Sequence, residues 1–524
     1  MKNKKREILV ISILLVLQTI LFVIVGFNKS YIHMDEAYSL GLASYDKVEI
    51  QYNEDFYDTW HTKDYYEDYL TVNDDEVGKY GQVYENQKND VHPPLYYLFL
   101  RIAMGFSKNH FSMWPGIIIN IVIYAFITIF TYLILQGLFK NKSHSKEKAI
   151  ILAFISSITM ASLTSVIYIR MYALSTLNIL ITTFLHMKLF ESKSINIKLL
   201  VAIGISALLG SLTHYYYLFY LVMLFILFAI KYIKEKDYKT LLYYVLTMAI
   251  AAIASLVIFP YSIQHMFFGY RGQGVISNLT NIPQFLTNIS LYLVKLNSYA
   301  FNGLLLPILI LIIALVVYIK IKNMHNKSEK QSDFTTFITL STLFYFLLVA
   351  VASPWIELRY IMPICGVVFI IVIYCLYNLV NKVFDEKKSN IIISVLLIFI
   401  LLAPIALNIS PEVLYSDKQE IVEKLENELN VPTLFFFNSQ NNRFLDDILL
   451  FAILDDSYIA KDLDYNEDNI KEILQGKDIS NGIVVFINEG QNNDNIIDTI
   501  KNSTNLDNSI YLKRLNACDV YYIN

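Results

Sequence analysis

Two adjacent carboxylates, Asp35 and Glu36, come shortly after an apolar run from Ile8 to Phe27. Charges beside hydrocarbon are costly unless they are hydrated, paired or used, so an acidic pair at the end of a membrane span is a candidate functional site. A solvated acidic first turn of a helix would give the same pattern. A partly desolvated carboxylate next to a like charge is a good proton acceptor, which suits deprotonation of a hydroxyl. Adjacent helical residues point about 100° apart, so we assign the base to Asp35 and expect Glu36 to orient a partner or a bound cation.

Three arginines, Arg170, Arg271 and Arg359, interrupt the apolar sequence further along the chain. A guanidinium is always charged and its fork binds phosphate oxygens in a bidentate way, so several at one membrane face predict an anionic headgroup. Arg170 and Arg359 also lie close to Tyr172 and Tyr360. For each arginine the alternative is a snorkelling side chain beside an aromatic belt residue.

Two histidines, His92 and His214, are further candidates for substrate binding. A histidine near the membrane interface is more often a hydrogen-bonded structural residue than a catalytic one, so this alternative stays open. Pro93 and Pro94 predict a stiff, extended entry after His92.

The elements that must position these residues are membrane helices. Of the 524 residues 55% are hydrophobic, in many separate runs about as long as a bilayer crossing. The sequence therefore predicts a polytopic α-helical membrane protein. A net charge of −4 argues against nucleic acid as a partner. Basic residues at 2–6 precede the first run, which we interpret as a retained span with the N-terminus in the cytoplasm.

The arrangement of the spans follows from the basic loops. Residues 28–92 are polar, acidic and rich in tyrosine, and predict a large first external loop with interfacial helices. The short apolar segment 95–106 is either a span or an outer surface helix. The second choice places the basic loops 140–146, 231–239, 320–330 and 382–388 in the cytoplasm, as the positive-inside rule prefers. Eleven spans are then predicted, at 8–27, 117–138, 149–168, 172–190, 198–213, 216–231, 240–260, 301–320, 334–352, 360–380 and 391–409.

This arrangement places the motifs around Arg170, His214, Arg271 and Arg359 on the outer side with Asp35, where they can share one external cavity. It also places the polar tail, residues 411–524, outside. Short apolar segments alternate with helical ones in this tail and predict a small α/β domain with a partly parallel sheet. The predicted strands are Thr433–Phe437 and Gly482–Ile487, and the predicted helices are Arg443–Leu454, Asn469–Leu474 and Asn495–Ile500.

Five motifs, in this order, resemble the GT-C glycosyltransferases. They are the acidic pair after the first span, His-Pro-Pro-Leu-Tyr-Tyr from His92, Arg-Met-Tyr-Ala-Leu from Arg170, Thr-His-Tyr from Thr213 and Arg-Tyr-x-x-Pro from Arg359. Within that superfamily the chain is similar to the group of protein O-mannosyltransferases and aminoarabinose transferases (family 39-type). The resemblance covers residues 1–410, which are expected to form the catalytic transmembrane domain.

The resemblance implies inverting transfer of a hexosyl or pentosyl group from a polyprenyl-phosphate donor to an acceptor outside the plasma membrane. It implies that Asp35 is the general base and that the outer arginines neutralise the charge of the leaving phosphate. Some members of the superfamily use a divalent cation, but no ligand set with metal spacing is evident here, so a metal stays open. The alternatives are a polymerase or ligase of lipid-linked glycans, and a transporter of lipid or solute. A transporter predicts ionisable groups in the middle of spans, whereas here they gather at one face.

Overall fold

The computed structural model describes residues 2–44, 54–140, 142–268, 281–322, 333–427, 429, 431–437, 444–461 and 466–524. The chain divides into two compact units. Unit 1 comprises Met1–Gly26, Asp90–Tyr96 and Ile117–Glu412, and unit 2 comprises Phe27–Asn89, Tyr97–Gly116 and Val413–Asn524. Residues 28–89 of the first loop, which we assigned from sequence to the transmembrane domain, thus pack within unit 2 together with the C-terminal segment, whereas residues 90–92 belong to unit 1.

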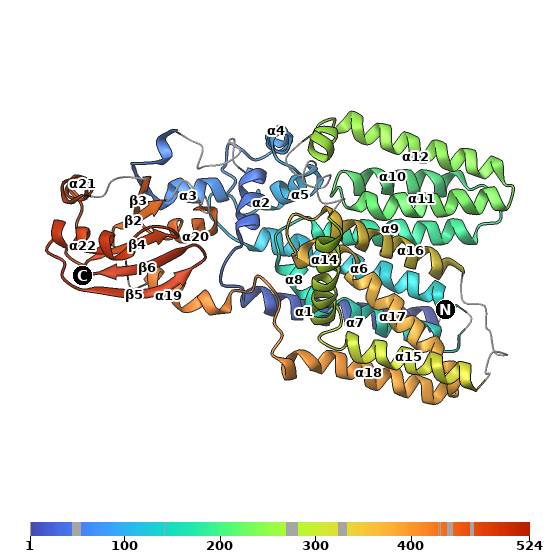
Figure 1. Cartoon of the computed structure of the whole chain (residues 1–524). Helices are drawn as coiled ribbons and strands as arrows, with labels where there is room; N and C mark the ends of the chain where they lie inside the picture. The colour runs from blue at the N-terminus through green and yellow to red at the C-terminus, as the bar shows by residue number, and fades with distance from the viewer. Residues whose placement is uncertain are drawn as a thin grey trace. The chain divides into compact units, whose positions relative to one another are not determined.

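Unit 1 is helical, and Figure 1 labels most of its helices. They are α1 (Lys2–Phe27), α6 (Trp114–Leu138), α7 (Ser145–Ser156), α8 (Met160–Ile167), α9 (Tyr172–Glu191), α10 (Ile197–Ser211), α11 (Tyr217–Lys234), α12 (Tyr238–Ile258), η3 (Gln264–Phe268), α14 (Ile282–Lys295), η4 (Leu296–Ala300), α15 (Leu305–Ile321), α16 (Asp333–Ala352), η6 (Leu358–Tyr360), α17 (Met362–Val383) and α18 (Glu386–Leu407).

Over the described residues, eight of these helices are long and apolar enough to cross a membrane, or up to ten if each of two bent pairs forms one crossing. Helix α10 has the position of an expected span but only 15 residues. The expectation of a polytopic helical membrane protein is confirmed, while the number of eleven crossings stays a prediction. Helix α5 (Leu95–Met104), the segment that we placed at the outer surface, has 10 residues. At about 1.5 Å per residue this is half the thickness of a bilayer core or less.

Two of the expected regions are bent. The span expected at 149–168 is the pair α7 and α8, which turns by 57°. The region expected as an external loop between residues 261 and 300 contains α14 and η4, which meet α15 at 99°. At this second bend Asn302 and Gly303 have φ of 52° and 90°, in the left-handed region that asparagine and glycine tolerate best.

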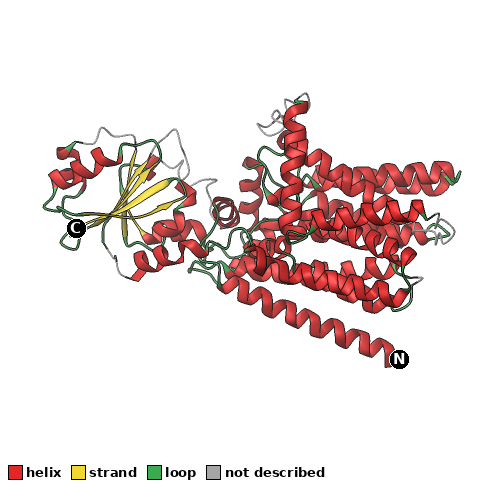
Figure 2. Ribbon diagram, turned by 60° about the horizontal axis from the view of Figure 1, so that its bottom comes forward, coloured by secondary structure: helices red, strands yellow, loops and turns green. Residues whose placement is uncertain are grey.

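Unit 2 is built on a six-stranded sheet, drawn in yellow in Figure 2. The strand order is β1-β3-β2-β4-β6-β5, with β2 parallel to both β3 and β4 and the outer pairs antiparallel. The elements of this unit are α2 (Met34–Ser44), η2 (Glu54–Phe56), β1 (Trp60–Thr62), α3 (Lys63–Leu70), α4 (Tyr80–Asn89), α5, η7 (Ser416–Lys418), α19 (Gln419–Asn427), β2 (Thr433–Phe437), η8 (Phe444–Asp446), α20 (Ile448–Phe451), β3 (Asp456–Lys461), α21 (Glu467–Ile473), β4 (Ile483–Asn488), α22 (Asn493–Ser503), β5 (Ser509–Leu515) and β6 (Cys518–Ile523).

The central strands β2 and β4 are buried along their whole length, as their continuous apolar sequences require, whereas the edge strand β5 is partly exposed. Alternate residues of a strand point to opposite faces. Leu434 and Phe436 therefore join one core with Ile470 of α21 and Ile500 of α22. On the other face Phe435 packs its ring against those of Phe444 and Phe451, from η8 and α20.

The expected α/β domain with a partly parallel sheet is confirmed. Strand Thr433–Phe437 has the predicted bounds, and the second predicted strand is β4. The predicted helix Arg443–Leu454 begins outside the described residues, which contain only the short η8 and α20 in that region. The sequence prediction did not include β1, β3, β5, β6 or α19.

Candidate active site

The candidate residues fall into two groups, one in each unit. In unit 2, Asp35 lies in the first turn of α2, and its side chain is 15% exposed. The backbone N–H of Asp35 donates to His33 Nδ1 at 3.0 Å. His33 thus acts as the N-cap of α2, because its ring accepts one of the donors that the helix leaves without an internal partner. The cap fixes the backbone that carries the Asp35 carboxylate.

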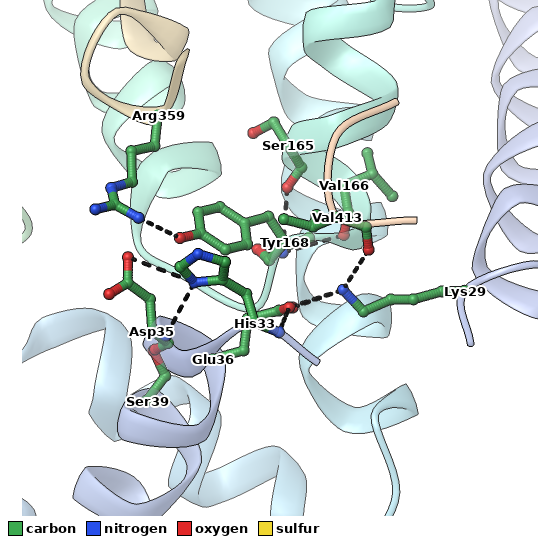
Figure 3. Close-up of polar contacts among 11 residues, drawn as sticks. Lys29, His33, Asp35, Glu36, Ser39, Ser165, Val166, Tyr168, Arg359 and Val413 are labelled. Carbon is green, nitrogen blue, oxygen red and sulfur yellow. Dashed lines mark hydrogen bonds and ion pairs between the residues drawn. The ribbon is translucent and has the colours of Figure 1, made fainter. Parts of the chain in front are cut away.

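Glu36, the neighbour of Asp35, is fully buried in an ion pair. Lys29 Nζ donates to both carboxylate oxygens of Glu36, at 2.9 and 2.8 Å, and to the carbonyl of Val413 at 3.1 Å (Figure 3). Glu36 also accepts from the N–H of His33 at 2.8 Å. The cation that Glu36 binds in this structure is therefore Lys29, which offsets the repulsion that we expected between Glu36 and Asp35.

In unit 1, Asp90, His92 and Arg170 form a chain of polar contacts. His92 Nδ1 is 2.8 Å from Asp90 Oδ2, and His92 Nε2 is 3.5 Å from Arg170 Nη2. A guanidinium can only donate, so the geometry assigns Nε2 as acceptor and Nδ1–H as donor to Asp90. Burial would raise the pKa of Asp90, but the electrostatic effects of His92 and Arg170, with the hydrogen bond from His92, lower it to about 2. The carboxylate is ionised and orients the imidazole.

The backbone around Arg170 is held in a break between two helices. Residues 168–171 separate α8 from α9, and the N–H of Arg170 donates to the carbonyl of Tyr168 at 2.7 Å. Asn120 of α6, fully buried, donates to the carbonyls of Val166 and Tyr168 at 3.1 and 2.8 Å. Asn120 thus satisfies carbonyls that the end of α8 leaves without helical partners. This arrangement keeps the Arg170 side chain, which is 4% exposed, beside His92.

Aromatic rings line the same part of unit 1. The Tyr172 ring lies 5.4 Å from His214 and is stacked on Tyr168 at 5.9 Å, centroid to centroid. His214 Nδ1 accepts from the N–H of Tyr216 at 3.1 Å, which fixes the orientation of the His214 ring in the turn between α10 and α11. The His214 centroid is 6.2 Å from that of His92. The structure therefore brings His92, Arg170, Tyr172 and His214 together.

Arg359 belongs to the same unit and contacts two tyrosines. Its Nη1 donates to the hydroxyl of Tyr168 at 3.3 Å (Figure 3), and its guanidinium carbon lies 5.2 Å from the centroid of Tyr360. Tyr360 in turn packs against Tyr216, with the ring centroids 5.8 Å apart. Arg359 is partly exposed, unlike Arg170. Arg359 thus lies beside its expected tyrosine neighbour, Tyr360, among packed rings.

Some candidate residues were missed from sequence, and one lies outside the described residues. Arg271 falls in 269–280, which the structure does not describe. Asp90 was missed, although its spacing of two residues from His92 was a usable signal. Lys29 and His33 were missed because neither an extended segment nor a histidine N-cap has a distinctive sequence pattern. Among the described residues, no three His, Cys, Asp or Glu side chains form a group able to hold a metal ion.

No family model and no curated protein matches the sequence. Among solved structures, the chain is similar to ArnT from Cupriavidus metallidurans, crystallised bound to undecaprenyl phosphate. The TM-score is 0.51 at 7% sequence identity, and the match covers 97% of each chain. At this identity the likeness establishes the fold, over both the helical unit and the C-terminal domain. The chain is a membrane protein with a GT-C-like fold.

Proposed function

We propose that this protein transfers a sugar from a polyprenyl-phosphate donor to an acceptor on the extracytoplasmic side of the membrane. The observation that carries the proposal is the group formed by buried Arg170 and His92 with the partly exposed Asp90, in a chain whose fold matches, end to end, that of a protein bound to undecaprenyl phosphate. Phosphate departure leaves concentrated negative charge, and fixed cations in a water-poor site stabilise it better than water does. Arg170 and Arg359 are the proposed phosphate ligands, and Arg271 is a third on the evidence of sequence alone.

In the proposed reaction an acceptor hydroxyl attacks the anomeric carbon of the sugar. The bond from that carbon to the phosphate oxygen breaks, and polyprenyl phosphate leaves with the bonding electrons. Asp35 takes the proton of the acceptor, and attack from the face opposite the phosphate inverts the anomeric configuration. Glu36 acts as a positioning residue through Lys29. His92, Tyr172, His214 and Tyr360 contact the donor headgroup.

An apolar pocket supports a lipid-linked donor. It lies among α10, α11 and α12, which run side by side in Figure 1, and has a volume of about 290 Å³. Its wall includes Leu218, Phe225 and Ala251, with Tyr215 from the turn that follows α10. Burial, with the charge of Asp90, raises the pKa of Tyr215. Tyr215 follows His214 directly in the sequence, so one wall of the hydrocarbon pocket lies next to a residue that we propose contacts the donor headgroup. An isoprenoid phosphate requires such a neighbouring pair of sites.

Filling the pocket should weaken donor binding. Ala251 of α12 is 6% exposed and lines the pocket, so in Ala251→Phe the new ring competes with the lipid chain. We expect the KM for the polyprenyl-phosphate sugar to rise about tenfold or more, since each methylene kept out of the pocket forfeits about 0.8 kcal/mol. Ala249→Phe, on an exposed face of the same helix, is the matched control. An equal KM in both variants would place the lipid chain elsewhere.

The reaction class is tested by following the donor. The purified full chain in lipid vesicles is given radiolabelled undecaprenyl-phosphate sugars and crude envelope acceptors. We expect label to leave the carrier and appear in an acceptor fraction, whose chemistry (protein, glycolipid or cell-wall polymer) follows from fractionation. If several donors with competent acceptors release no label, the transferase proposal is wrong, and lipid translocation becomes the activity to assay.

A further inference from the structure

The segment just before α2 is attached to the start of the C-terminal segment by two hydrogen bonds to backbone carbonyls. Lys29 Nζ donates to the carbonyl of Val413, and the N–H of Ser30 donates to the carbonyl of Leu414, both at 3.1 Å. Lys29 is buried, so its contact is shielded from water. Two successive residues before α2 are thus attached to two successive residues that lead into the α/β domain.

Tyr31 extends this attachment into the domain itself. Its side chain is fully buried, and its hydroxyl donates to Asp447 Oδ1 at 3.4 Å. Lys418 Nζ lies 4.3 Å from the centroid of the Tyr31 ring, and Tyr415 packs edge-on against the same ring at 5.9 Å. Asp447 is held by Asn516 Nδ2 at 2.8 Å, beside the β5–β6 turn. Tyr31 is therefore fixed by Lys418 of η7 and by Asp447 at the start of α20, and Asp447 is in turn held by the β5–β6 turn.

The backbone at this contact has an unfavourable conformation. Val413 and Tyr415 have φ of 58° and 56°. A β-branched residue with positive φ is a genuine outlier, and such residues persist only where their surroundings impose the conformation. Here the conformation directs the carbonyls of Val413 and Leu414 at Lys29 and Ser30.

The side chain of Glu36 connects this attachment to the first turn of α2, which carries Asp35. Lys29 pairs with Glu36, and Glu36 accepts from the N–H of His33, the N-cap of α2. The other end of α2 is held by α5, because buried Arg101 of that helix donates to the carbonyl of Ala43 at 3.0 Å. Hydrogen bonds to Lys29 and His33 thus connect segment 29–33 with the first turn of α2, where Asp35 lies.

We propose that the C-terminal α/β domain positions the Asp35 carboxylate for proton transfer, with Tyr31 and Lys418 as positioning residues. The proposal rests on the proposed role of Asp35 as general base. It gives the domain a role that requires no ligand of its own. Loss of the attachment displaces the base but leaves the donor-binding residues of unit 1 in place, so it should lower kcat and leave the KM for the donor unchanged.

Tyr31→Phe and Lys418→Met are the informative variants. Tyr31→Phe removes one hydroxyl and keeps the packed ring. Burial, with the charge of Asp446, raises the pKa of Asp447 to about 7. An asparagine side chain also has an oxygen that accepts hydrogen bonds. Asp447→Asn would therefore keep the contact with Tyr31 and would not test it. Lys461→Met is the matched control, since Lys461 Nζ also lies over a tyrosine ring of unit 2, that of Tyr57, at 4.4 Å.

The experiment combines kinetics with hydrogen exchange on the purified full chain in lipid. We expect kcat to fall about tenfold in Tyr31→Phe and Lys418→Met, because small displacements of a catalytic group cost one to two orders of magnitude in rate. The KM for the donor should not change. Backbone amides at residues 33–38 should exchange faster than in the wild type, and Lys461→Met should match the wild type in both measurements.

The possible failures are distinguishable. If Asp35→Asn is inactive while Tyr31→Phe and Lys418→Met keep wild-type kcat, the positioning proposal is overturned and the transferase proposal stands. If the wild type transfers no sugar, the transferase proposal fails. Hydrogen exchange then still decides whether the domain holds the first turn of α2, and unchanged exchange at residues 33–38 would overturn that attachment.

Discussion

Replacing Asp35 with asparagine is expected to lower sugar transfer by about 100-fold or more, the usual contribution of a general base. The change removes the negative charge and the proton-accepting oxygen pair but keeps the size of the side chain. The N–H of Asp35 donates to His33 through the backbone, so the cap of α2 survives the substitution. The lost interaction of the carboxylate with the helix dipole is worth only about 0.3–1 kcal/mol. The measurement is release of label from the lipid-linked donor by folded protein.

The matched control for this variant is Asp64→Asn. Asp64 also lies in the first turn of a helix in unit 2, that of α3, but its side chain is exposed. It should therefore carry the same small effect on stability and no effect on transfer. Wild-type transfer by Asp35→Asn would remove Asp35 from the mechanism, whereas equal losses in both variants would indicate a general effect of charge on unit 2.

The acidic pair illustrates what sequence alone can and cannot predict about this site. Position after a span identifies Asp35 and Glu36 as a pair, but their different environments depend on Lys29, which lies seven residues before Glu36 in an extended segment. A spacing of seven residues would place both on one face of a helix, but Lys29 lies between α1 and α2, outside any helix, so this pattern does not predict their contact. The same holds for Val413, whose carbonyl accepts a hydrogen bond from Lys29 although the two residues are 384 positions apart in the sequence. Contacts set by tertiary packing leave no local pattern.

The fold shows the same distinction between local and long-range signals. Strand Thr433–Phe437 was predicted with its bounds because a run of buried apolar residues is a strong local signal. Strand β1 was not, since its three residues form a strand only by pairing with β3. Helix α14 was missed because polar residues such as Gln284 and Asn288 gave its segment the character of a loop. In the structure Asn288 is buried and donates to the carbonyl of Ala350 at 2.8 Å.

Replacing Lys29 with methionine is expected to destabilise unit 2 by about 3–5 kcal/mol, because the change leaves the Glu36 carboxylate buried without its cation. Both side chains of the pair have 0% exposure, so water cannot replace the lost partner. The measurement is the shift in unfolding midpoint on heating or in denaturant. Lys63→Met is the control, since Lys63 and Asp455 form an exposed pair at 3.5 Å in the same unit. Removing such a surface pair is worth about 0–1 kcal/mol.

A second substitution separates the charge of Glu36 from its hydrogen bond. In Lys29→Met/Glu36→Gln no charge remains buried, and the glutamine oxygen can still accept from the N–H of His33, as Glu36 does at 2.8 Å. The double variant should therefore recover most of the stability that Lys29→Met loses, with an interaction energy of about 2 kcal/mol or more between the two changes.

The activity of this double variant tests whether Glu36 takes part in the reaction itself. If Glu36 acts only by positioning α2, the rate of sugar transfer by the double variant should lie within about tenfold of the wild-type rate. A loss of that size is expected from a displaced catalytic group, whereas removal of a catalytic group costs more. A folded but inactive double variant would instead mean that the Glu36 charge takes part in the reaction itself, and that Lys29 tunes it.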